Sequence, residues 1–253
     1  KFRRACENAD RVIAVSDFTK KEIIQYYGID EKKIDVVYQG CDPVFAKEVS
    51  DEVKKDVSGR HNLPDRFLLY VGSIEERKNL LLAVKAVVML HEKGENINIV
   101  AVGRSTPYLD EVVGYAEANG ISHLIHIRHG VNYDDLPVFY KLATAFVYPS
   151  RIEGFGIPML EAITSGLPAI GCNGSCLEEA GGPHSLYVNP DDVVGMADAI
   201  HSVYNDVTLR QNMIAQGKEY ARRFDIAKLT SDLYEVYKTV CGSHRGMEPN
   251  SLL

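Results

Sequence analysis

Short runs of Val, Ile, Leu, Tyr and Ala alternate along the chain with longer stretches in which apolar residues recur every three or four positions. Short, almost continuously apolar runs are typical of parallel strands buried on both faces, and the longer amphipathic stretches are typical of the helices that cover such a sheet. We predict strands at residues 11–16, 34–38, 67–71, 97–102, 124–127, 145–148, 168–170 and 186–188. We predict helices at residues 17–27, 48–59, 79–93, 107–119, 134–142 and 156–164, and a helical region over 191–240. The alternation indicates an α/β protein with a doubly wound, Rossmann-like parallel sheet.

Turn-forming residues divide the chain into these elements. Gly94 and Gly120 follow predicted helices, where a glycine commonly ends the last turn. Residues 39–43 form a turn-rich exit from the second predicted strand and mark a candidate domain boundary. Residues 1–5 read like the middle of a helix and carry neither an initiator Met nor a signal-peptide pattern, so we expect a fragment of a longer protein. Residues 242–253 lack periodicity and are expected to form a loose tail.

Composition and charge narrow the possible functions. The 253 residues are 45% hydrophobic and 25% charged, as in ordinary globular proteins. A formal charge of −7 provides no broad positive field for a nucleic acid or an anionic bilayer. No apolar run approaches the ~20 residues of a membrane span. The five cysteines are scattered, which favours a reducing, cytosolic setting, and Cys172, Cys176 and His184 match no standard zinc spacing. We therefore expect no metal.

Residues that directly follow the strands are the first candidates for a site, because ligands of open parallel sheets bind at the carboxyl ends of the strands. Gly72 follows the strand predicted at 67–71 and would let the backbone approach a ligand closely. Arg77 and Lys78 supply two cations just before a helix begins. Backbone donors, a helix N-terminus and two cations together suit an anion such as a phosphate. A solvated basic pair that binds nothing is the alternative.

The segment 148–161 carries the strongest signal in the sequence. Gly154 and Gly156 flank Phe155 and remove side chains from a loop that leads into a predicted helix. Unpaired N–H groups at the end of the strand predicted at 145–148 could therefore face a diphosphate.

Two carboxylates belong to the same segment. Glu153 lies in the loop and Glu161 lies within the predicted helix, so the two cannot form a tight catalytic pair. They could instead bind separate hydroxyl-bearing rings, either two sugars or a sugar and a ribose. The alternative is that Glu153 stabilises the helix N-terminus and that Glu161 is an exposed helical residue. Apolar neighbours on both sides of Glu161 argue against the second part of this alternative.

Two further loops follow the strands predicted at 97–102 and 124–127. Gly103 and Val131 lie in these loops, whose main-chain groups could recognise a base, although a glycine after a strand is equally common in ordinary turns. The sequence contains no Walker A motif, no Gly-x-Ser-x-Gly elbow and no Gly-x-Gly-x-x-Gly after the first strand. NTPase, hydrolase and dehydrogenase interpretations lose support accordingly.

Several motifs in order resemble one known family. Glu153 and Glu161 are separated by seven residues within Glu-Gly-Phe-Gly-Ile-Pro-Met-Leu-Glu, which is similar to the signature of the retaining, nucleotide-sugar-dependent glycosyltransferases of family four. The other matching stretches are 9–16, 70–72 with 77–79, 145–150 and 175–179. The resemblance runs from about residue 9 to residue 238 and is specific for the family, much less so for the substrate.

The resemblance implies a two-domain GT-B fold of which this chain is the C-terminal, donor-binding half. Residues 1–33 would be the last strand and helix of an N-terminal acceptor domain, residues 34–241 the nucleotide-sugar-binding domain, and residues 242–253 a tail. The acceptor, a glycan or a lipid-linked glycan, would bind mainly to the missing half. The chain alone would then be nearly inactive.

The resemblance also assigns roles to residues. Arg77, Lys78 and the loop of Gly154, Phe155 and Gly156 would hold the diphosphate, and Gly72 would border it. In the family, Glu153 would contact donor-sugar hydroxyls and Glu161 the ribose, and the base would rest near Gly103 and Val131. Many members carry Arg directly after the glycine at position 72, whereas this chain has Ser73, so the arrangement of cations around the diphosphate stays open.

The function implied is transfer of a hexose from a nucleotide-diphosphate sugar with retention of configuration and without a metal or other cofactor. The arrangement around Ser73, Arg77, Lys78 and Asn79 is similar to branches that contain mannosyltransferases, which favours GDP-mannose and leaves a UDP-sugar open. No nucleic-acid partner is expected. We expect a cytoplasmic location, with peripheral attachment to the inner face of the membrane as an alternative. A non-catalytic sugar-nucleotide-binding or scaffolding domain is the competing interpretation.

Overall fold

The computed structural model describes residues 1–244, with side chains described through Gly242. These residues form two compact units. The first comprises residues 1–40 and the segment that begins at Arg223, and the second comprises residues 41–222. The family resemblance divided the chain after residue 33 instead, and that division remains a prediction. Most of the predicted tail, residues 245–253, lies outside the described residues, and the last helix continues through His244.

The first unit contains a pair of short parallel strands. Its elements are α1 (Phe2–Asn8), β1 (Val12–Ala14), α2 (Asp17–Tyr27), η1 (Glu31–Lys33), β2 (Ile34–Val36) and α11 (Ile226–His244). Ser16 begins α2 by accepting a hydrogen bond from the N–H of Thr19, and Gly28 ends it in the left-handed conformation. Val12 is in register with Ile34, so both predicted strands exist in shortened form.

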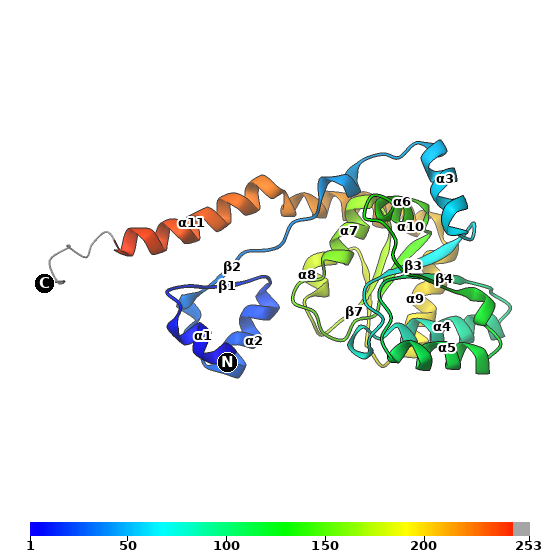
Figure 1. The fold of residues 1–253 in the computed structure, drawn as a ribbon, viewed down its shortest axis with the longest axis horizontal. Coiled ribbons are helices and arrows are strands. Elements are labelled where there is room, and N and C mark those ends of the chain that lie inside the picture. The colour runs from blue at the N-terminus through cyan, green and yellow to red at the C-terminus, as the bar shows by residue number, and fades with distance from the viewer. Residues whose placement is uncertain (245–253) are drawn as a thin grey trace, which may run out of the picture. The chain divides into compact units, whose positions relative to one another are not determined.

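The second unit is built on a six-stranded parallel sheet (Figure 1). Its strands are β3 (Phe67–Val71), β4 (Asn98–Val102), β5 (Ile125–Arg128), β6 (Ala145–Tyr148), β7 (Ala169–Cys172) and β8 (Leu186–Val188), in the order β5-β4-β3-β6-β7-β8. Leu69 at the centre pairs with Val100 on one side and Phe146 on the other. The strand order reverses between β3 and β6, which is the switch point of a doubly wound sheet. The predicted fold class is confirmed.

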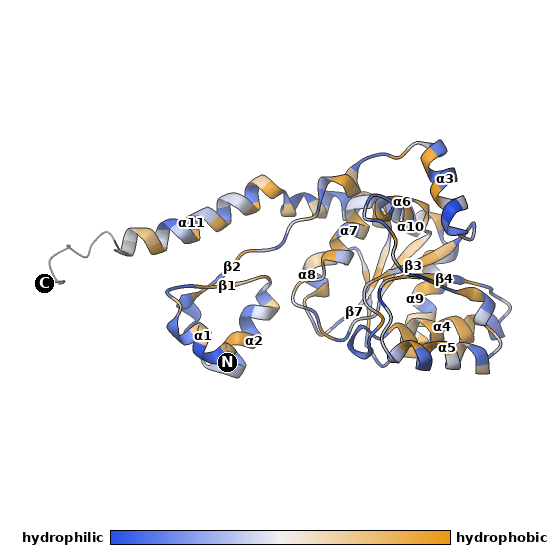
Figure 2. Cartoon of the chain, viewed as in Figure 1, coloured by the Kyte–Doolittle hydropathy of each residue, from blue (hydrophilic) through white to orange (hydrophobic). Residues whose placement is uncertain are grey.

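Helices cover both faces of this sheet. They are α3 (Asp51–His61), α4 (Leu80–Glu92), α5 (Tyr108–Ala118), α6 (Leu136–Leu142), α7 (Ile157–Ser165), α8 (Leu177–Gly181), α9 (Val193–Asn205) and α10 (Val207–Ala221), with single turns η2 (Pro43–Ala46), η3 (Glu76–Lys78) and η4 (Ser122–Leu124). A further single turn, η5 (Arg222–Phe224), spans the division between the two units in the sequence. Figure 2 shows that α4 is largely hydrophobic. It belongs to the core, because it is buried on almost every side.

Two features of the helices differ from the sequence prediction. The short helix α8 was not predicted, because five residues are too few to show a helical period. The region predicted as helical over 191–240 is three helices, since Asp206 ends α9 and caps α10 through the N–H of Leu209.

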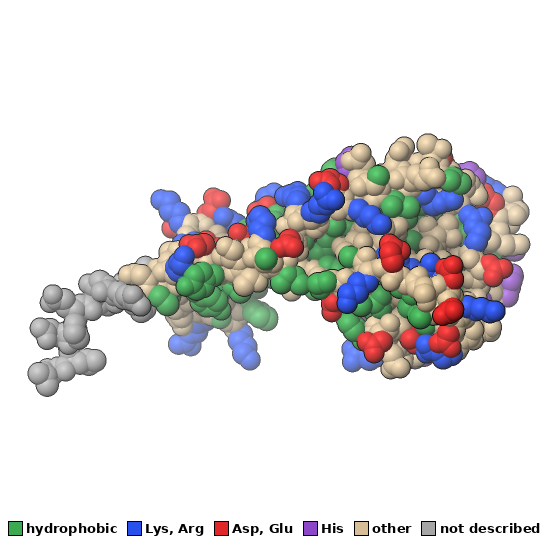
Figure 3. Space-filling model, turned by 90° about the horizontal axis from the view of Figure 1, so that it is seen from above, with side chains coloured by type: hydrophobic (Ala, Val, Ile, Leu, Met, Phe, Trp, Pro, Cys, Tyr) green, Lys and Arg blue, Asp and Glu red, His purple; other side chains and the backbone are tan. Residues whose placement is uncertain are grey.

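The surface of the second unit agrees with the modest net charge. On the face in Figure 3, Lys and Arg side chains are interspersed with Asp and Glu side chains. None of the helices in the described part of the chain combines the length and the apolar character needed to cross a membrane.

Candidate functional site

The loops that follow β3 and β6 meet at the switch point of the sheet. The N–H of Arg151 donates to the carbonyl of Arg77 at 2.8 Å, and the Arg77 guanidinium donates to the carbonyl of Ile152 at 3.1 Å. These bonds hold the segment that carries Arg77 and Lys78 against the segment that carries Glu153. Two loops about 75 residues apart in sequence thus form one site, as the strand order requires.

A lysine and a glutamate form the centre of this site. The Lys78 ammonium lies 2.9 Å from Oε1 of Glu153, and both side chains are largely buried, at 10% and 13% exposed. The same Oε1 accepts hydrogen bonds from the hydroxyls of Tyr148 at 3.0 Å and Ser150 at 2.9 Å, and Arg77 lies 3.2 Å away. Lys78 also donates to the Tyr148 hydroxyl. One carboxylate oxygen is therefore fixed by four groups.

The second oxygen of Glu153 is in a different position. Within the described residues, Oε2 has no hydrogen-bond partner. Burial by itself raises the pKa of Glu153, but the hydrogen bond and charge of Lys78 and the hydrogen bonds from Ser150 and Tyr148 outweigh it, so that the pKa lies below its usual range. Glu153 is ionised at neutral pH and offers one oriented acceptor.

Two alternatives from the sequence are wrong for these residues. Lys78 is 8% exposed, so it does not belong to a solvated basic pair, although its neighbour Arg77 is half exposed and pairs with Glu75 at 2.7 Å. Glu153 does not cap α7, because the residue before the helix is Gly156 and no side chain caps the first turn.

One position of the glycine-rich loop sterically requires a glycine. Gly156 has φ 101°, and a Cβ there would come within 2.7 Å of Leu177 Cδ2, so the position accepts only glycine without rearrangement. Phe155 is 2% exposed and anchors the loop in the core, while Gly154 is exposed. On the β3 side, the Lys78 stem packs over Gly72, whose Cβ position is 3.2 Å from Lys78 Cδ.

Glu161 lies on α7 at a second polar position. The buried Tyr140 hydroxyl donates to its Oε2 at 2.7 Å. The Tyr140 ring is 5.4 Å from Phe146, which stacks at 5.7 Å on Tyr148, the residue bonded to Glu153. A row of buried aromatic rings thus connects the supports of the two glutamates, and the carboxylates themselves are separate, as the sequence predicts.

Replacing Glu161 with Gln tests the environment of this carboxylate. Burial raises the pKa of Glu161 and the charge of Asp42 adds to it, while the hydrogen bond from Tyr140 opposes them. The unfolded chain loses the Glu161 proton at a lower pH than the folded chain does. The ionised carboxylate therefore lowers the free energy of unfolding at neutral pH. We expect the free energy of unfolding of E161Q, relative to wild type, to be higher at neutral pH than at acid pH in urea titrations. A stability of E161Q relative to wild type that does not change with pH would contradict this, and the exposed Glu117→Gln variant is the control for removing a surface carboxyl.

The residues predicted near the base share one hollow. It has a volume of about 430 Å³ and is lined by Val102, Gly103, Arg104, Ser105, His129, Gly130 and Val131. His129 is held by the carbonyl of Gly103 at 2.7 Å and the hydroxyl of Ser105 at 3.0 Å. Position 103 also requires a glycine for steric reasons, because a Cβ there would lie 1.8 Å from the carbonyl oxygen of Gly72. Binding of a base in this hollow remains a prediction.

Sequence reasoning missed the tyrosine and serine residues that support the two glutamates. Tyr148 ends β6 at the switch point and Ser150 follows two residues later, so their positions alone marked them as candidates. Tyr140 gave no such signal, because it reads as an ordinary apolar residue of α6. Among the described residues, no group of three or more His, Cys, Asp or Glu side chains could hold a metal ion. That the reaction uses no metal remains a prediction.

Comparison with known families decides the family of the chain. The family described as "Glycosyl transferases group 1" matches this chain over residues 51–220, and the family described as "Glycosyltransferase Family 4" matches it over residues 1–45. The chain belongs to the glycosyl transferases group 1 family. The resemblance found in the sequence is thereby confirmed.

Relatives of this group 1 glycosyltransferase include named mannosyltransferases. It is 27% identical to the O-antigen chain mannosyltransferase B of Escherichia coli over 94% of this chain and 62% of the relative. It is 26% identical to the O-antigen chain mannosyltransferase RfbU of Salmonella typhimurium over 88% of this chain and 58% of that relative. The chain thus spans about 60% of the length of these two proteins.

Solved structures share the fold. A glycosyltransferase from Rickettsia africae superimposes with a TM-score of 0.84 at 19% identity, covering 95% of this chain and 67% of that one. Anabaena HepE in complex with UDP-glucose superimposes with a TM-score of 0.80 at 18% identity, covering 91% of this chain and 64% of that one.

Proposed function

We propose that this chain is the donor-binding part of a retaining glycosyltransferase that moves a hexose from a nucleotide-diphosphate sugar to a glycan or lipid-linked acceptor. The observation that carries the proposal is the paired Lys78 and Glu153 at the switch point, where one carboxylate oxygen is fixed and the other is unpartnered among the described residues. Membership of the group 1 family supports it.

Glu153 orients the donor sugar in this proposal. A depressed pKa keeps its carboxylate charged, and Oε2 accepts a hydroxyl of the hexose as a charge-assisted hydrogen bond. The supports on Oε1 fix the rotamer before the donor arrives, so little side-chain freedom is lost on binding. Glu153 positions the sugar and forms no covalent bond to it.

The cations and the glycine-rich loop hold the diphosphate. Lys78 uses two of its three N–H groups on Tyr148 and Glu153 and keeps one for a phosphate oxygen, and the half-exposed Arg77 adds a guanidinium. At the start of α7, which no side chain caps, the N–H of Ile157 adds a backbone donor. These groups stabilise the negative charge that grows on the leaving nucleoside diphosphate, a role filled by a metal ion in other enzymes.

The nucleoside occupies the remaining polar positions. Glu161 accepts a ribose hydroxyl, and its bond to Tyr140 fixes the carboxylate. The base enters the hollow between Gly103 and Val131. The nucleotide then lies along the carboxyl edge of the sheet, with the hexose at Glu153.

We favour GDP-mannose as the donor, because the relatives in Escherichia coli and Salmonella are named mannosyltransferases. HepE, a neighbour in fold, binds UDP-glucose, which keeps a UDP-sugar as the second candidate. The acceptor binds to a segment outside this sequence. The proposed location is the cytoplasm, where nucleotide sugars would meet the site.

Glu153→Gln tests the role of this carboxylate. Calorimetry on the 253-residue chain should show GDP-mannose binding about tenfold weaker in E153Q than in wild type, because a charge-assisted hydrogen bond is lost, while GDP alone binds about equally. Hexose transfer by the complete protein should fall about 100-fold or more, since the sugar is no longer oriented. The exposed Glu117→Gln variant is the matched control and should behave as wild type.

Three outcomes separate the alternatives. Failure of wild type to bind any of GDP, UDP, GDP-mannose, UDP-glucose or UDP-N-acetylglucosamine at millimolar concentration would overturn the proposal. Donor binding without transfer by the complete protein would favour the non-catalytic binding domain instead. Equal donor binding and transfer by E153Q and E117Q would remove Glu153 from the site.

A further inference from the structure

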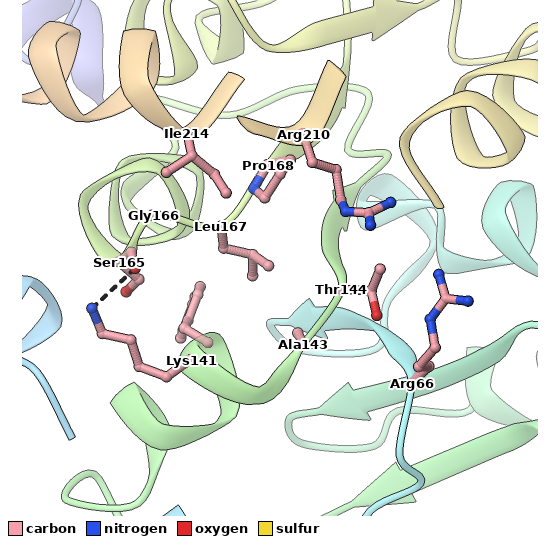
Figure 4. Close-up of a pocket in the computed structure, with 11 residues that line it drawn as sticks. Arg66, Lys141, Ala143, Thr144, Ser165, Gly166, Leu167, Pro168, Arg210 and Ile214 are labelled. Carbon is pink, nitrogen blue, oxygen red and sulfur yellow. Dashed lines mark hydrogen bonds between the residues drawn. The ribbon is translucent and has the colours of Figure 1, made fainter. Parts of the chain in front are cut away.

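A second hollow lies at the opposite edge of the sheet, where the strands begin (Figure 4). Its volume is about 360 Å³. It is lined by Arg66, Tyr140, Lys141, Ala143, Thr144, Ser165, Gly166, Leu167, Pro168, Arg210 and Ile214. Arg66, Thr144 and Pro168 directly precede or lie beside the first residues of β3, β6 and β7. The hollow is therefore distinct from the proposed donor site, which lies beyond the last residues of these strands.

Two arginines meet on one side of this hollow. The guanidinium groups of Arg66 and Arg210 lie near Thr144 in Figure 4. Both donate to the same acceptor, the carbonyl of Tyr204, at 2.5 and 2.8 Å, and Arg210 also donates to the carbonyl of Val203 at 2.7 Å. The Arg66 guanidinium stacks on the Tyr204 ring at 4.2 Å. These contacts hold two positive charges in fixed orientations close together.

No carboxylate balances these charges. Within the described part of the chain, neither arginine forms an ion pair, and the residues lining the hollow include no Asp or Glu. Each guanidinium has five N–H groups, so one bond by Arg66 and two by Arg210 leave most of their donors for a ligand. Two guanidinium groups without a counter-ion in a protein of net charge −7 are suited to a bound anion.

The opposite side of the hollow carries a third cation and an unsatisfied hydroxyl. Lys141 donates to the carbonyl of Ser165 at 3.0 Å, as drawn in Figure 4. Ser165 is only 5% exposed, and its hydroxyl has no hydrogen-bond partner. Burial lowers the pKa of Lys141, and the charges of Lys218 and Lys54 add to this against that of Glu48. Lys141 adds a third positive charge to the lining of the hollow.

We infer that this hollow binds a phosphate-bearing small molecule, with the phosphate between the Arg66 and Arg210 guanidinium groups and the polar remainder toward Lys141. The volume exceeds that of inorganic phosphate and suits a phosphorylated sugar, and Leu167, Pro168 and Ile214 provide an apolar wall for the ring. Planar guanidinium groups bind phosphate oxygens in pairs, which a lysine cannot do.

A purely structural role makes a different prediction. The carbonyls of Val203 and Tyr204 belong to the last turn of α9, so the arginines could serve only to cap that helix. Capping needs no ligand and leaves the two guanidinium charges without a counter-ion among the described residues. It also predicts that phosphate has no effect on these side chains.

Arginine side-chain NMR distinguishes the two roles without altering the protein. We expect the Nε–H signals of Arg66 and Arg210 to shift saturably with millimolar inorganic phosphate and with a hexose 6-phosphate, and to stay in place in sodium chloride of equal ionic strength. Arg210→Gln should weaken the binding of hexose 6-phosphate about tenfold or more, as expected for the loss of charge-assisted hydrogen bonds. The control Arg222→Gln removes the same charge from an exposed pair with Glu219 and should change nothing.

Two comparisons complete the test. Arg77→Gln, which alters the proposed donor site, should leave the shifts at Arg66 and Arg210 intact, so that failure of the donor proposal is separate from failure here. Vesicles containing phosphatidic acid serve as the lipid source of the same group: binding to vesicles alone, lost in R210Q, would assign the hollow to a lipid headgroup. No shift with either soluble phosphate and no vesicle binding, or shifts that R210Q leaves unchanged, would overturn the inference.

Discussion

Replacing Lys78 with Met is expected to weaken binding of a nucleoside diphosphate about 100-fold and to lower the free energy of unfolding by about 2–3 kcal/mol. Lys78 is 8% exposed, and its ammonium supplies the closest positive charge to the Glu153 carboxylate. Without it, a largely buried charge keeps only the partly exposed Arg77 as a cationic partner. The remaining bonds from Tyr148 and Ser150 keep the cost below that of a fully unpaired buried charge.

The pH dependence of this loss follows from the pKa of Glu153. Its folded-state pKa lies below the usual range, with Lys78 as the main cause of the lowering against burial, so Glu153 contributes stability above its unfolded pKa. That contribution is lost as pH falls through the folded pKa. The difference between wild type and K78M should therefore be largest at neutral pH and shrink under acid conditions. Urea unfolding across pH, with NMR titration of the Glu153 carboxyl, measures both quantities.

Two comparison variants make the result specific. Lys47→Met removes an exposed charge from the same unit and should change neither stability nor binding appreciably. The double variant K78M/E153Q should recover much of the stability lost by K78M, since no unbalanced charge remains buried. If K78M leaves both the pKa of Glu153 and the stability unchanged, the ion pair is not the organising contact of the site.

The sequence was sufficient for the order of the strands and of the longer helices, and for which loops meet at the switch point. Helices and buried parallel strands have different hydrophobic patterns in the sequence, so the two can be told apart. Gly28 marks the end of α2 directly. Once the strands are known, the topology puts the residues after β3 and β6 at the switch point of the sheet. Arg77, Lys78 and Glu153 accordingly come together.

The sequence did not predict which side chains support the site. Whether Lys78 is solvated or buried depends on packing against Tyr148 and Glu153, residues more than sixty positions away. Tyr140 sits in α6 among apolar residues, so its bond to Glu161 leaves no periodic signal. Long-range partners of this kind are set by how the loops fold over the sheet, and local spacing does not encode them.

Gly103 shows how one residue permits two interpretations. The sequence favours Gly103 as a contact for a base, and the structure gives this position a steric requirement that needs no ligand. The N–H of Gly72 donates to Val102 at 2.9 Å and that of Ile74 donates to Arg104 at 2.9 Å, so the chain after β3 continues alongside the chain after β4. Only a residue without a side chain at position 103 allows this close approach.

Gly103→Ala is expected to destabilise the second unit by about 3–5 kcal/mol, near the upper end for a single substitution. The new Cβ would lie 1.8 Å from the carbonyl oxygen of Gly72 and 2.6 Å from its carbon. Backbone must therefore move, which breaks the bonds from Gly72 and Ile74 that join the two loops. Because Lys78 packs over Gly72, the displacement also moves the ammonium, and nucleoside diphosphate binding should weaken even where the variant still folds.

Gly114→Ala provides the matched comparison for this prediction. Gly114 lies in α5 with nothing within 4 Å of its Cβ position, so alanine there should stabilise the helix by about 0.5–1 kcal/mol. The same substitution thus has opposite signs at two positions of one unit, and urea unfolding measures both. If G103A proved as stable as wild type, the loops after β3 and β4 could separate without cost. The fixed position of Lys78, on which donor binding depends, would then need another explanation.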